Sequence, residues 1–518
     1  MMDQLQASVF AFLENPDSHG GEPVRRFDTH GSAVFLAGDR ALKVKRAVSF
    51  PFLDYSTLDK RKAACIAELE VNRRFAPELY RRVVPITREA DGRLAIDGSG
   101  EVIEWAVEMQ RFDENQTLDH IADQGKLDSR LAAQLAAISR AIHHNAPPAD
   151  AARWIAAVAT YIEQNSEAFR AYPDIFAEAD VARLEQTMRG QFVRLKPLLV
   201  KRGAQGFVRL GHGDLHLGNI AFINGHPVAF DAIEFSPVVA SGDVLYDLAF
   251  LLMDLVERGQ VTNANIVLNG TIGSHGPLEE LDGLACLPMF MSLRAAIRAK
   301  VIAARLDQGS DNAGAIEASA RRYFNLALTL LEPHQPRMIC IGGLSGVGKS
   351  AIARKLAETI PPLPGALVLR SDVMRKRMLG CPEFERLPAD AYDAETSARV
   401  YAELAARAVR TVRADYPVII DATFTDGGAR EMIESTAHDA GVAMVGLFLT
   451  ADIETRIARI TQRGPDASDA DARLARAQET YDLDAIAWAK VDASGPFEQT
   501  LRQIRDILSR HDTNASAH

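Results

Sequence analysis

The chain has 518 residues, of which 47% are hydrophobic and 25% are charged. This composition is typical of folded globular domains and excludes a wholly disordered or fibrous chain, and at about 150 residues per domain the length predicts two or three domains. The formal net charge of −11 argues against a general binder of nucleic acids or other polyanions.

Other global features indicate a cytoplasmic protein. Charged residues interrupt the apolar runs before they reach the ~20 residues of a membrane helix, and the N-terminus lacks the pattern of a secretory signal. The four cysteines, Cys65, Cys286, Cys340 and Cys381, match neither zinc-site spacing nor a disulfide framework. They fit a reducing compartment, so we expect a cytoplasmic location and no membrane partner.

The first part of the chain begins with strand patterns. Residues 32–36 and 41–44 flank a turn at 38–40 and predict a β-hairpin. Residues 59–75 predict a helix, and the alternation of apolar and polar residues over 103–109 predicts a strand.

Helical patterns dominate the rest of this part, from 127 to 199 and from 246 to 331. Short strands are predicted between them, at 208–210, 220–223 and 228–230. Strands first and helices later predict an α+β fold with two lobes, in which a small β-rich lobe lies on a larger helical one.

A linker is predicted at 331–336, where two prolines bracket a polar stretch. It separates a first domain, 1–333, from a second, 337–509, which is followed by a polar tail at 510–518. In the second domain strands alternate with helices, which is typical of a three-layer α/β fold with a parallel sheet. The strands are predicted at 338–341, 366–369, 418–420 and 444–449.

The second domain opens with a phosphate-binding motif. GLSGVGKS satisfies the pattern G-x-x-x-x-G-K-[ST], and it follows a predicted strand and precedes a predicted helix. Its glycines let backbone N–H groups surround phosphate oxygens, Lys349 can reach the β- and γ-phosphates, and the Ser350 hydroxyl can bind Mg²⁺. The predicted nucleotide-binding residues are Gly343, Leu344, Ser345, Gly346, Val347, Gly348, Lys349 and Ser350.

Two acidic residues follow neighbouring strands of this domain. Asp421 comes after 418–420 and suits a second-shell or water-mediated hold on Mg²⁺. Ala422 follows it where motor-type ATPases usually carry a glutamate, so transfer is favoured over hydrolysis. Asp372 comes after 366–369 and can accept a proton from a substrate hydroxyl, with a helix N-cap as the alternative.

Several arginines flank a flexible polar loop at 464–469 and suggest a lid that brings an arginine to the transferring phosphoryl group. For at least half of them the alternative is a solvated charged surface. They are Arg456, Arg459, Arg463, Arg473 and Arg476.

The segments GGLSGVGKS, RSD and VIIDATF, together with this lid, resemble the P-loop small-molecule and polynucleotide kinases, including gluconate-kinase-like and zeta-toxin-like proteins. The resemblance covers about 336–509. It implies that Asp372 is the base on the substrate side and that Arg463 and Arg473 are the lid arginines. A nucleotide-type acceptor is compatible with it.

A second set of polar residues lies in the first domain, where H-x-D-x-x-x-x-N is followed by an aspartate after a strand. Asp214 suits contact with an attacking hydroxyl, and Asn219 and Asp231 suit a hold on Mg²⁺. His212 would then brace the loop. The alternatives are a metal site made of His212, Asp214 and His216, and a polar turn with buried histidines.

This set resembles the aminoglycoside phosphotransferase and choline kinase-like family, over about 27–331. The resemblance implies that Lys43 binds phosphate, with Lys45 as the alternative, and that Glu68 is its ion-pair partner, with Glu70 second. The hinge that contacts adenine would comprise Glu108, Met109 and Gln110.

Further features refine that resemblance. Residues 29–32 are the nearest candidate for a glycine-rich phosphate loop, and Asp243 and Asp247 look like the acids that brace the catalytic loop. The segments THGSAVFLAG, ALKVKRAV and NRRFAPELY resemble a bacterial group that fuses this domain to a P-loop kinase, which implies two ATP sites.

We therefore expect a phosphotransferase with ATP and Mg²⁺ as cofactors. It would carry two kinase-type sites and transfer the γ-phosphate to an alcohol group of an unidentified small molecule. The alternative is a nucleotide-sensing regulatory or toxin/antidote-like protein in which one ATP site does not catalyse transfer. No nucleic-acid partner is expected.

Overall fold

A computed structural model describes residues 2–50, 53–274, 276–308, 312–462, 464, 466–481, 483 and 486–515. The chain forms two compact units. The first comprises Met1–Val158 and Val200–Asp254, and the second comprises Ala159–Leu199 and Leu255–His518. Packing therefore does not divide the chain at the expected linker, although 331–336 contain neither helix nor strand. The domain boundaries remain a prediction.

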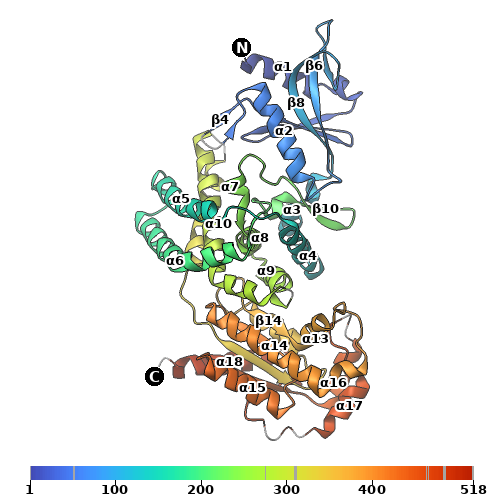
Figure 1. The fold of residues 1–518 in the computed structure, drawn as a ribbon, viewed down its shortest axis with the longest axis vertical. Helices are drawn as coiled ribbons and strands as arrows, with labels where there is room; N and C mark the ends of the chain where they lie inside the picture. Colours follow the sequence, from blue (N-terminus) through green and yellow to red (C-terminus); the bar gives the residue numbers. More distant parts are fainter. Residues whose placement is uncertain are drawn as a thin grey trace. The chain divides into compact units, whose positions relative to one another are not determined.

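A six-stranded antiparallel sheet forms the first lobe, in the order β1-β2-β3-β8-β6-β7 (Figure 1). The expected hairpin is present, since β2 and β3 pair across a turn where Gly38 has φ +54°. The strands are β1 (Val24–Asp28), β2 (Ser32–Ala37), β3 (Arg40–Lys45), β6 (Tyr80–Arg88), β7 (Leu94–Ile96) and β8 (Glu101–Gln110).

Helices cover this sheet on opposite faces. α1 (Met2–Glu14), which the sequence interpretation missed, shares a buried apolar cluster with alternate residues of β3, Leu42 and Val44. Because side chains alternate along a strand, Lys43 and Lys45 lie on the other face. That face is covered by α2 (Leu58–Asn72), which packs against β8 and β6 (Figure 1).

The rest of the first unit contains short strand pairs and the helices that support them. β9 (Val208–Leu210) and β10 (Ile220–Ile223) form where they were predicted. β10 pairs with β11, and β9 pairs with β12. The other elements are β4 (Ser49–Phe50), β5 (Leu53–Asp54), α3 (Leu118–Asp123), α4 (Ser129–Asn145), β11 (His226–Ala229), α7 (Pro237–Ala240) and β12 (Ser241–Asp243).

Helices fill the sequence between the two sheets, as the apolar periodicity predicts. Three of them continue from one unit into the other: α5 (Ala151–Arg170), α6 (Glu178–Ala204) and α8 (Val244–Glu257). The second unit adds α9 (Val261–Leu268), the π-helix η4 (Asn269–Gly273), the 3₁₀-helix η5 (Leu278–Cys286), α10 (Leu287–Ala303) and α11 (Ala313–Thr329).

The second unit also holds a five-stranded parallel sheet in the order β14-β15-β13-β16-β17, which confirms the predicted fold class. Four strands coincide closely with the predicted ones, and β17 was missed. They are β13 (Met338–Gly343), β14 (Leu367–Arg370), β15 (Val418–Asp421), β16 (Met444–Thr450) and β17 (Ala489–Asp492).

Helices pack on both faces of the parallel sheet. α12 and α18 share a buried apolar cluster with β13, while α14 contacts α15 and the strands β13, β14 and β15. The helices are α12 (Lys349–Ala357), α13 (Ser371–Met378), α14 (Ala394–Arg413), α15 (Gly427–Asp439), α16 (Ile453–Gln462), α17 (Ala472–Ala477) and α18 (Phe497–Ala515).

The open edge of β14 is covered by α9 and η4. Asn265 Nδ2 donates to the Ala366 carbonyl at 3.1 Å. Asn269 Oδ1 accepts from the Val368 N–H at 2.6 Å, so asparagine side chains satisfy backbone groups that would otherwise lack a strand partner. The buried Arg407 of α14 donates to the Gly273 carbonyl at 3.2 Å and fixes the end of η4.

Candidate active sites

The structure brings Asp214 and Asn219 together in the loop between β9 and β10. Asn219 Nδ2 donates to Asp214 Oδ2 at 2.8 Å and to the Asp214 carbonyl at 3.0 Å. Gly213 precedes them with φ +80°, and a Cβ built there would lie 2.9 Å from Ala240 Cα. The loop therefore requires glycine at this position.

His212 braces this loop, as predicted. Its side chain is fully buried, its Nε2 donates to the Phe230 carbonyl at 3.0 Å, and burial lowers the pKa of the ring. Among the described residues no group of three or more His, Cys, Asp or Glu side chains could hold a metal ion. The alternative of a metal site built on His212, Asp214 and His216 finds no support there.

Two acids of α8 accept hydrogen bonds from backbone N–H groups of this loop. Asp247 accepts from the N–H groups of His212 and Gly213 at 3.2 and 3.0 Å. Asp254 accepts from the Leu217 N–H at 3.0 Å, a contact that the sequence interpretation missed. The spacing of seven residues places both acids on one side of the helix, and this periodicity could have revealed the second one.

Asp243 has a different role from the one that the resemblance implied. It forms a fully buried ion pair with Arg202, whose Nε lies 2.7 Å from Asp243 Oδ2. Asp243 Oδ1 also accepts from the Leu245 N–H at 3.0 Å. These contacts fix the start of α8 to α6, and only Asp247 of the two predicted acids contacts the catalytic loop.

Lys43 and Lys45 point from one face of β3 to a single carboxylate on α2. Lys43 Nζ lies 2.7 Å from Glu68 Oε1, and Lys45 Nζ lies 2.7 Å from Glu68 Oε2. The Glu68 side chain is fully buried, whereas Glu70 is exposed. The sequence left the two lysines as alternatives, and the structure pairs both of them with Glu68.

Asp231 completes this network. It follows β11 and Phe230 with φ +59°, a backbone conformation that residues with a Cβ rarely adopt. Lys43 Nζ lies 2.5 Å from Asp231 Oδ1. The N–H of Phe230 donates to the Asn219 carbonyl at 2.9 Å, so the two predicted magnesium ligands come from adjoining backbone segments.

Asn72 holds the residue after Asp231 in place. Its Oδ1 accepts from the Ala232 N–H at 2.7 Å, and its Nδ2 donates to the Ala232 carbonyl at 3.2 Å. Asn72 lies one turn after Glu68, so one face of α2 orients both the lysines and the turn that carries Asp231. The sequence interpretation did not identify Asn72.

A cavity of about 500 Å³ joins these residues. Lys43, Asp214 and Asp231 line it at one end, and the predicted hinge residues Met109 and Gln110 line it as well. Most of its remaining wall is apolar. The cavity thus offers a hydrophobic surface together with basic and acidic side chains, a combination suited to a nucleotide.

Two further predictions concern the walls of this cavity. The turn 29–32 lines it between β1 and β2, where the nearest substitute for a glycine-rich loop was expected. The third predicted hinge residue, Glu108, is not among the lining residues. Its carboxylate lies 3.0 Å from Arg82 Nε, because it points to the opposite side of β8 from Met109.

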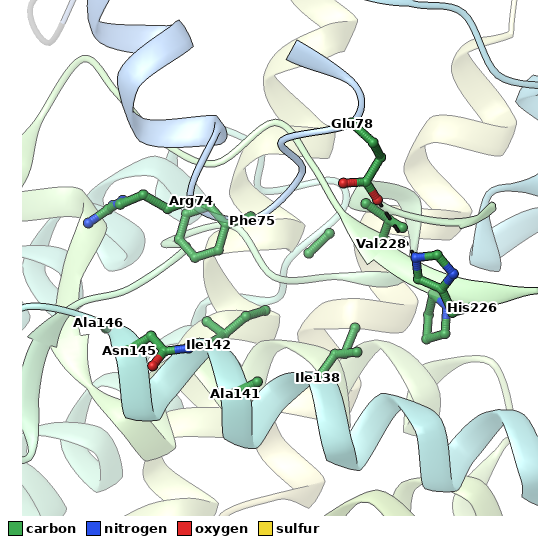
Figure 2. Close-up of a pocket in the computed structure, with 12 residues that line it drawn as sticks. Arg74, Phe75, Glu78, Ile138, Ala141, Ile142, Asn145, Ala146, His226 and Val228 are labelled. Carbon is green, nitrogen blue, oxygen red and sulfur yellow. Dashed lines mark ion pairs between the residues drawn. The ribbon is translucent and has the colours of Figure 1, made fainter. Parts of the chain in front are cut away.

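A second cavity of about 330 Å³ lies behind the catalytic loop, between α4 and β11 (Figure 2). Ile138 and Ile142 of α4 form one wall, and Phe75 lies opposite them. The Phe75 ring also packs on His212, with 5.3 Å between ring centroids. In the part of the chain that the structure describes, none of the predicted site residues lines this cavity.

The phosphate-binding motif forms the loop between β13 and α12. Gly343, Gly346 and Gly348 have φ values of +139°, +83° and +104°. A Cβ at Gly343 would lie 2.6 Å from the Leu449 carbonyl oxygen, and one at Gly346 would lie 2.5 Å from that of Arg456. Side chains at these positions would not fit, so this backbone path requires glycine.

Lys349 begins α12 and points back into the loop. Its Nζ donates to the carbonyls of Gly343 and Leu344 at 2.8 and 3.1 Å. Burial lowers the pKa of Lys349 below its ordinary value, and the nearby Asp421 only partly offsets this. A buried ammonium held by carbonyls at a helix N-terminus is prepared to receive an anion.

Two arginines that were weighed as lid residues support the loop instead. The buried Arg456 donates from Nε to the Ser345 carbonyl at 2.9 Å, and Arg459 donates to the Val347 carbonyl at 2.8 Å. Gln478 Oε1 accepts from the Ser345 N–H at 2.9 Å. These contacts fix the loop rather than reaching a substrate.

Of the two predicted lid arginines, the described residues include Arg473 alone. Arg463 lies outside the described residues. Arg473 is exposed on α17. Among the described residues it has no ion pair with Asp372. Its role as a lid arginine remains a prediction.

Asp372 and Asp421 lie at the carboxyl edge of the parallel sheet, where ligands bind in such folds. Asp372 is in the first turn of α13, and burial together with the Asp421 charge raises the pKa of its carboxyl group. Asp421 ends β15 directly opposite Arg370 of β14. Arg370 Nη2 donates to the Ser350 hydroxyl at 3.2 Å.

Each of two segments of the chain matches the model of a known protein family. Residues 54–281 match the model of the phosphotransferase enzyme family, and residues 338–483 match that of the AAA domain. The chain joins a phosphotransferase-family domain to an AAA domain. No helix of the described residues has the length and apolar character needed to cross a membrane.

Two mycobacterial relatives match this chain along nearly their whole length. Uncharacterized proteins of Mycobacterium tuberculosis (strain H37Rv) and Mycobacterium bovis are each 29% identical over 491 residues, which is 93% of this chain and 94% of theirs.

Two solved structures resemble parts of the chain. A choline/ethanolamine kinase family protein from Mesorhizobium loti is 15% identical, with a TM-score of 0.37, and covers 64% of this chain and 95% of its own. A gluconokinase from Sinorhizobium meliloti is 21% identical, with a TM-score of 0.26, and covers 36% of this chain and 100% of its own.

The Glu68 carboxylate of the phosphotransferase domain gives a testable pH dependence. Burial alone would raise its pKa, but the ammonium groups of Lys43 and Lys45 lower it below the ordinary value. A lowered pKa in the folded state means that this stabilisation is present above the pKa of the unfolded chain, about 4.3, and is lost as the pH falls below it.

We expect Glu68→Gln to lower the local stability of α2 and β3 by about 3 kcal/mol at pH 7, because two buried ammonium groups lose their shared partner. The loss should shrink between pH 5 and pH 3. Hydrogen exchange of these segments measures it, with Glu70→Gln as the matched exposed control. Equal exchange in the two variants at pH 7 would contradict the assignment.

Proposed function

We propose that the chain is a phosphotransferase with one ATP site in each domain, and that each site transfers the γ-phosphoryl group to a hydroxyl of a small molecule. The observation that carries this proposal is the cavity of about 500 Å³ in which Lys43, Asp214 and Asp231 meet beside an apolar wall. These are the groups that phosphoryl transfer requires around a bound nucleotide.

The residues present fit ATP with Mg²⁺. In the phosphotransferase domain Lys43 would contact the phosphates, and Asn219 and Asp231 would hold the metal. In the AAA domain the glycines permit a loop path that a Cβ at Gly343 or Gly346 would obstruct. Ser350 and Asp421 would hold the metal. Bound Mg²⁺ neutralises charge on the β- and γ-phosphates.

In the phosphotransferase domain, Asp214 would orient the acceptor hydroxyl and accept its proton. The acceptor oxygen then bonds to the γ-phosphorus while the bond to the β,γ-bridging oxygen breaks, and ADP leaves. Asn219 holds Asp214 Oδ2 at 2.8 Å and so fixes the direction of the carboxylate. Catalysis would come mostly from positioning and charge stabilisation.

In the AAA domain, Asp372 would accept the proton of the acceptor hydroxyl. Burial and the neighbouring Asp421 raise the pKa of Asp372, which makes it a better proton acceptor. Lys349 would contact the β- and γ-phosphates, and Arg463 and Arg473 are proposed to approach the transferring group from the lid. The spacing of the four cysteines, which matches no disulfide framework, supports a cytoplasmic location.

The test is transfer of labelled γ-phosphate from ATP by the purified full chain to a panel of hydroxyl metabolites that includes nucleosides. Products formed by the wild type and lost separately in Asp214→Asn and Lys349→Ala would assign an acceptor to each domain. The alternative, a nucleotide-sensing regulatory protein, is supported by the turn at 29–32, which holds one glycine only. ATP binding at both sites with transfer at one alone, or at neither, would favour that alternative.

A further inference from the structure

Arg370 occupies a central position in the AAA site that the proposed mechanism does not use. It ends β14, and only 12% of its side chain is exposed. Its Nε lies 3.3 Å from Asp421 Oδ2, and its Nη2 donates to the Ser350 hydroxyl at 3.2 Å. The same Nη2 lies 2.7 Å from Asp466 Oδ1, in the loop before α17.

The charges around this guanidinium explain why it is held there. Asp421 has a 5% exposed side chain and Asp372 is half-buried nearby, so their carboxylates need a cation. The other cation of the site, Lys349, is directed at two backbone carbonyls of the phosphate loop. Burial works against the charged form of Arg370, yet Asp421 and Asp466 raise its pKa above the ordinary value.

Ser350 and Asp421, the two side chains proposed to hold Mg²⁺ in this domain, are both bound by Arg370. We propose that Arg370 takes the place of the metal ion in the AAA site and must leave Asp421 and Ser350 before Mg²⁺ can bind. This inference rests on the proposed function, because it uses the metal ligands assigned there. It follows that Mg²⁺ should bind weakly to the AAA domain when no nucleotide is present.

Binding of ATP would favour Mg²⁺ over Arg370 at Asp421 and Ser350. The phosphates bring negative charge next to Lys349 and offer the guanidinium of Arg370 oxygens to bind in exchange for Asp421. Arg370 would then act as a positioning residue beside the γ-phosphate, while Asp466 keeps hold of Nη2. Metal binding is thereby made dependent on nucleotide, and the acidic site is protected from other divalent cations.

The test is a titration of the full chain with Mn²⁺ in the absence of nucleotide, followed by electron paramagnetic resonance. All variants carry Asp231→Asn, which disables the proposed metal site of the phosphotransferase domain. Arg370→Gln should bind Mn²⁺ about tenfold more tightly than the parent, because a competing cation is gone. Arg399→Gln, an equal charge change at an exposed residue of α14, should not.

A double-mutant cycle makes the result specific to the site. Asp421→Asn should cost little Mn²⁺ affinity when Arg370 is present, because Arg370 already engages Asp421, and about tenfold when Arg370 is replaced. Arg370→Lys should bind Mn²⁺ with an affinity between those of the parent and Arg370→Gln, since one nitrogen replaces the two with which Arg370 contacts Ser350 and Asp421. The effect of Asp421→Asn in the parent is measured without altering Arg370, so the test survives if Arg370→Gln fails to fold.

The outcomes separate this inference from the proposed function. If Asp421→Asn lowers Mn²⁺ affinity equally with and without Arg370, Arg370 does not compete with the metal, and the metal site still stands. If Asp421→Asn changes nothing in either background, both this inference and the assignment of Asp421 as a metal ligand are wrong. Nucleotide binding through Lys349 is measured independently and is unaffected by either result.

Discussion

Replacing Lys349 by alanine should abolish ATP binding at the AAA domain and reduce the number of nucleotides bound per chain from two to one. The ammonium donates to two carbonyls of the phosphate loop, and its loss removes the charge-assisted hydrogen bonds proposed to two phosphates. We expect the affinity of this site to fall by about a hundredfold or more. Calorimetric titration with ATP measures both the stoichiometry and the affinity.

The folded protein should tolerate this change. Among the described residues no carboxylate is bonded to Lys349, and burial lowers its pKa. Replacing it therefore removes the free-energy cost of burying an ammonium and breaks no ion pair. Lys355→Ala is the matched control, because that lysine lies on the same helix but pairs with Glu358 at an exposed position. Two nucleotides bound with unchanged affinity in Lys349→Ala would show that the loop is not an ATP site.

Asp214→Asn should slow transfer at the phosphotransferase domain by about 10²- to 10⁴-fold and leave ATP affinity nearly unchanged. The amide has the size of the carboxylate but cannot accept the proton of the acceptor hydroxyl, and general-base catalysis contributes about this much. Single-turnover transfer with the acceptor found in the metabolite panel measures the rate.

The control for this variant is Asp128→Asn, which makes the same change at the N-cap of α4, where asparagine also caps well. A fall in ATP affinity as large as the fall in rate would show that Asp214 serves nucleotide binding instead. Unchanged transfer would remove Asp214 from the mechanism altogether.

Local sequence patterns predicted much of this architecture. The strands β9, β10, β13, β15 and β16 are short apolar runs bounded by turn residues, and such runs are visible in a sequence. The phosphate loop was equally visible, because its glycines are required by the close approach of Leu449 and Arg456. Both features depend on neighbours along the chain.

Contacts between distant segments were not visible in the same way. Asn72 looks like an ordinary end to a helix until Ala232, 160 residues away, is found bonded to it. Arg456 was one of several arginines in a charged stretch, and only the fold shows that it is buried against the phosphate loop. Helix α1 was missed because its role lies in covering a sheet formed later in the chain.

The cover over the edge of β14 has a consequence for how the chain can be divided. Asn265 and Asn269 fill the hydrogen bonds of that strand, and Arg410 forms a bidentate pair with Asp282 of η5, with distances of 2.6 and 2.9 Å. Asn265, Asn269 and Asp282 precede the prolines at 333 and 336, whereas β14 and Arg410 follow them. A protease that nicked the exposed connection there would sever one covalent bond and still release no fragment, since the two pieces would remain clamped together. A gene truncated at the same point would encode the AAA domain with the edge of β14 uncovered. We expect this fragment to aggregate unless the preceding segment is supplied.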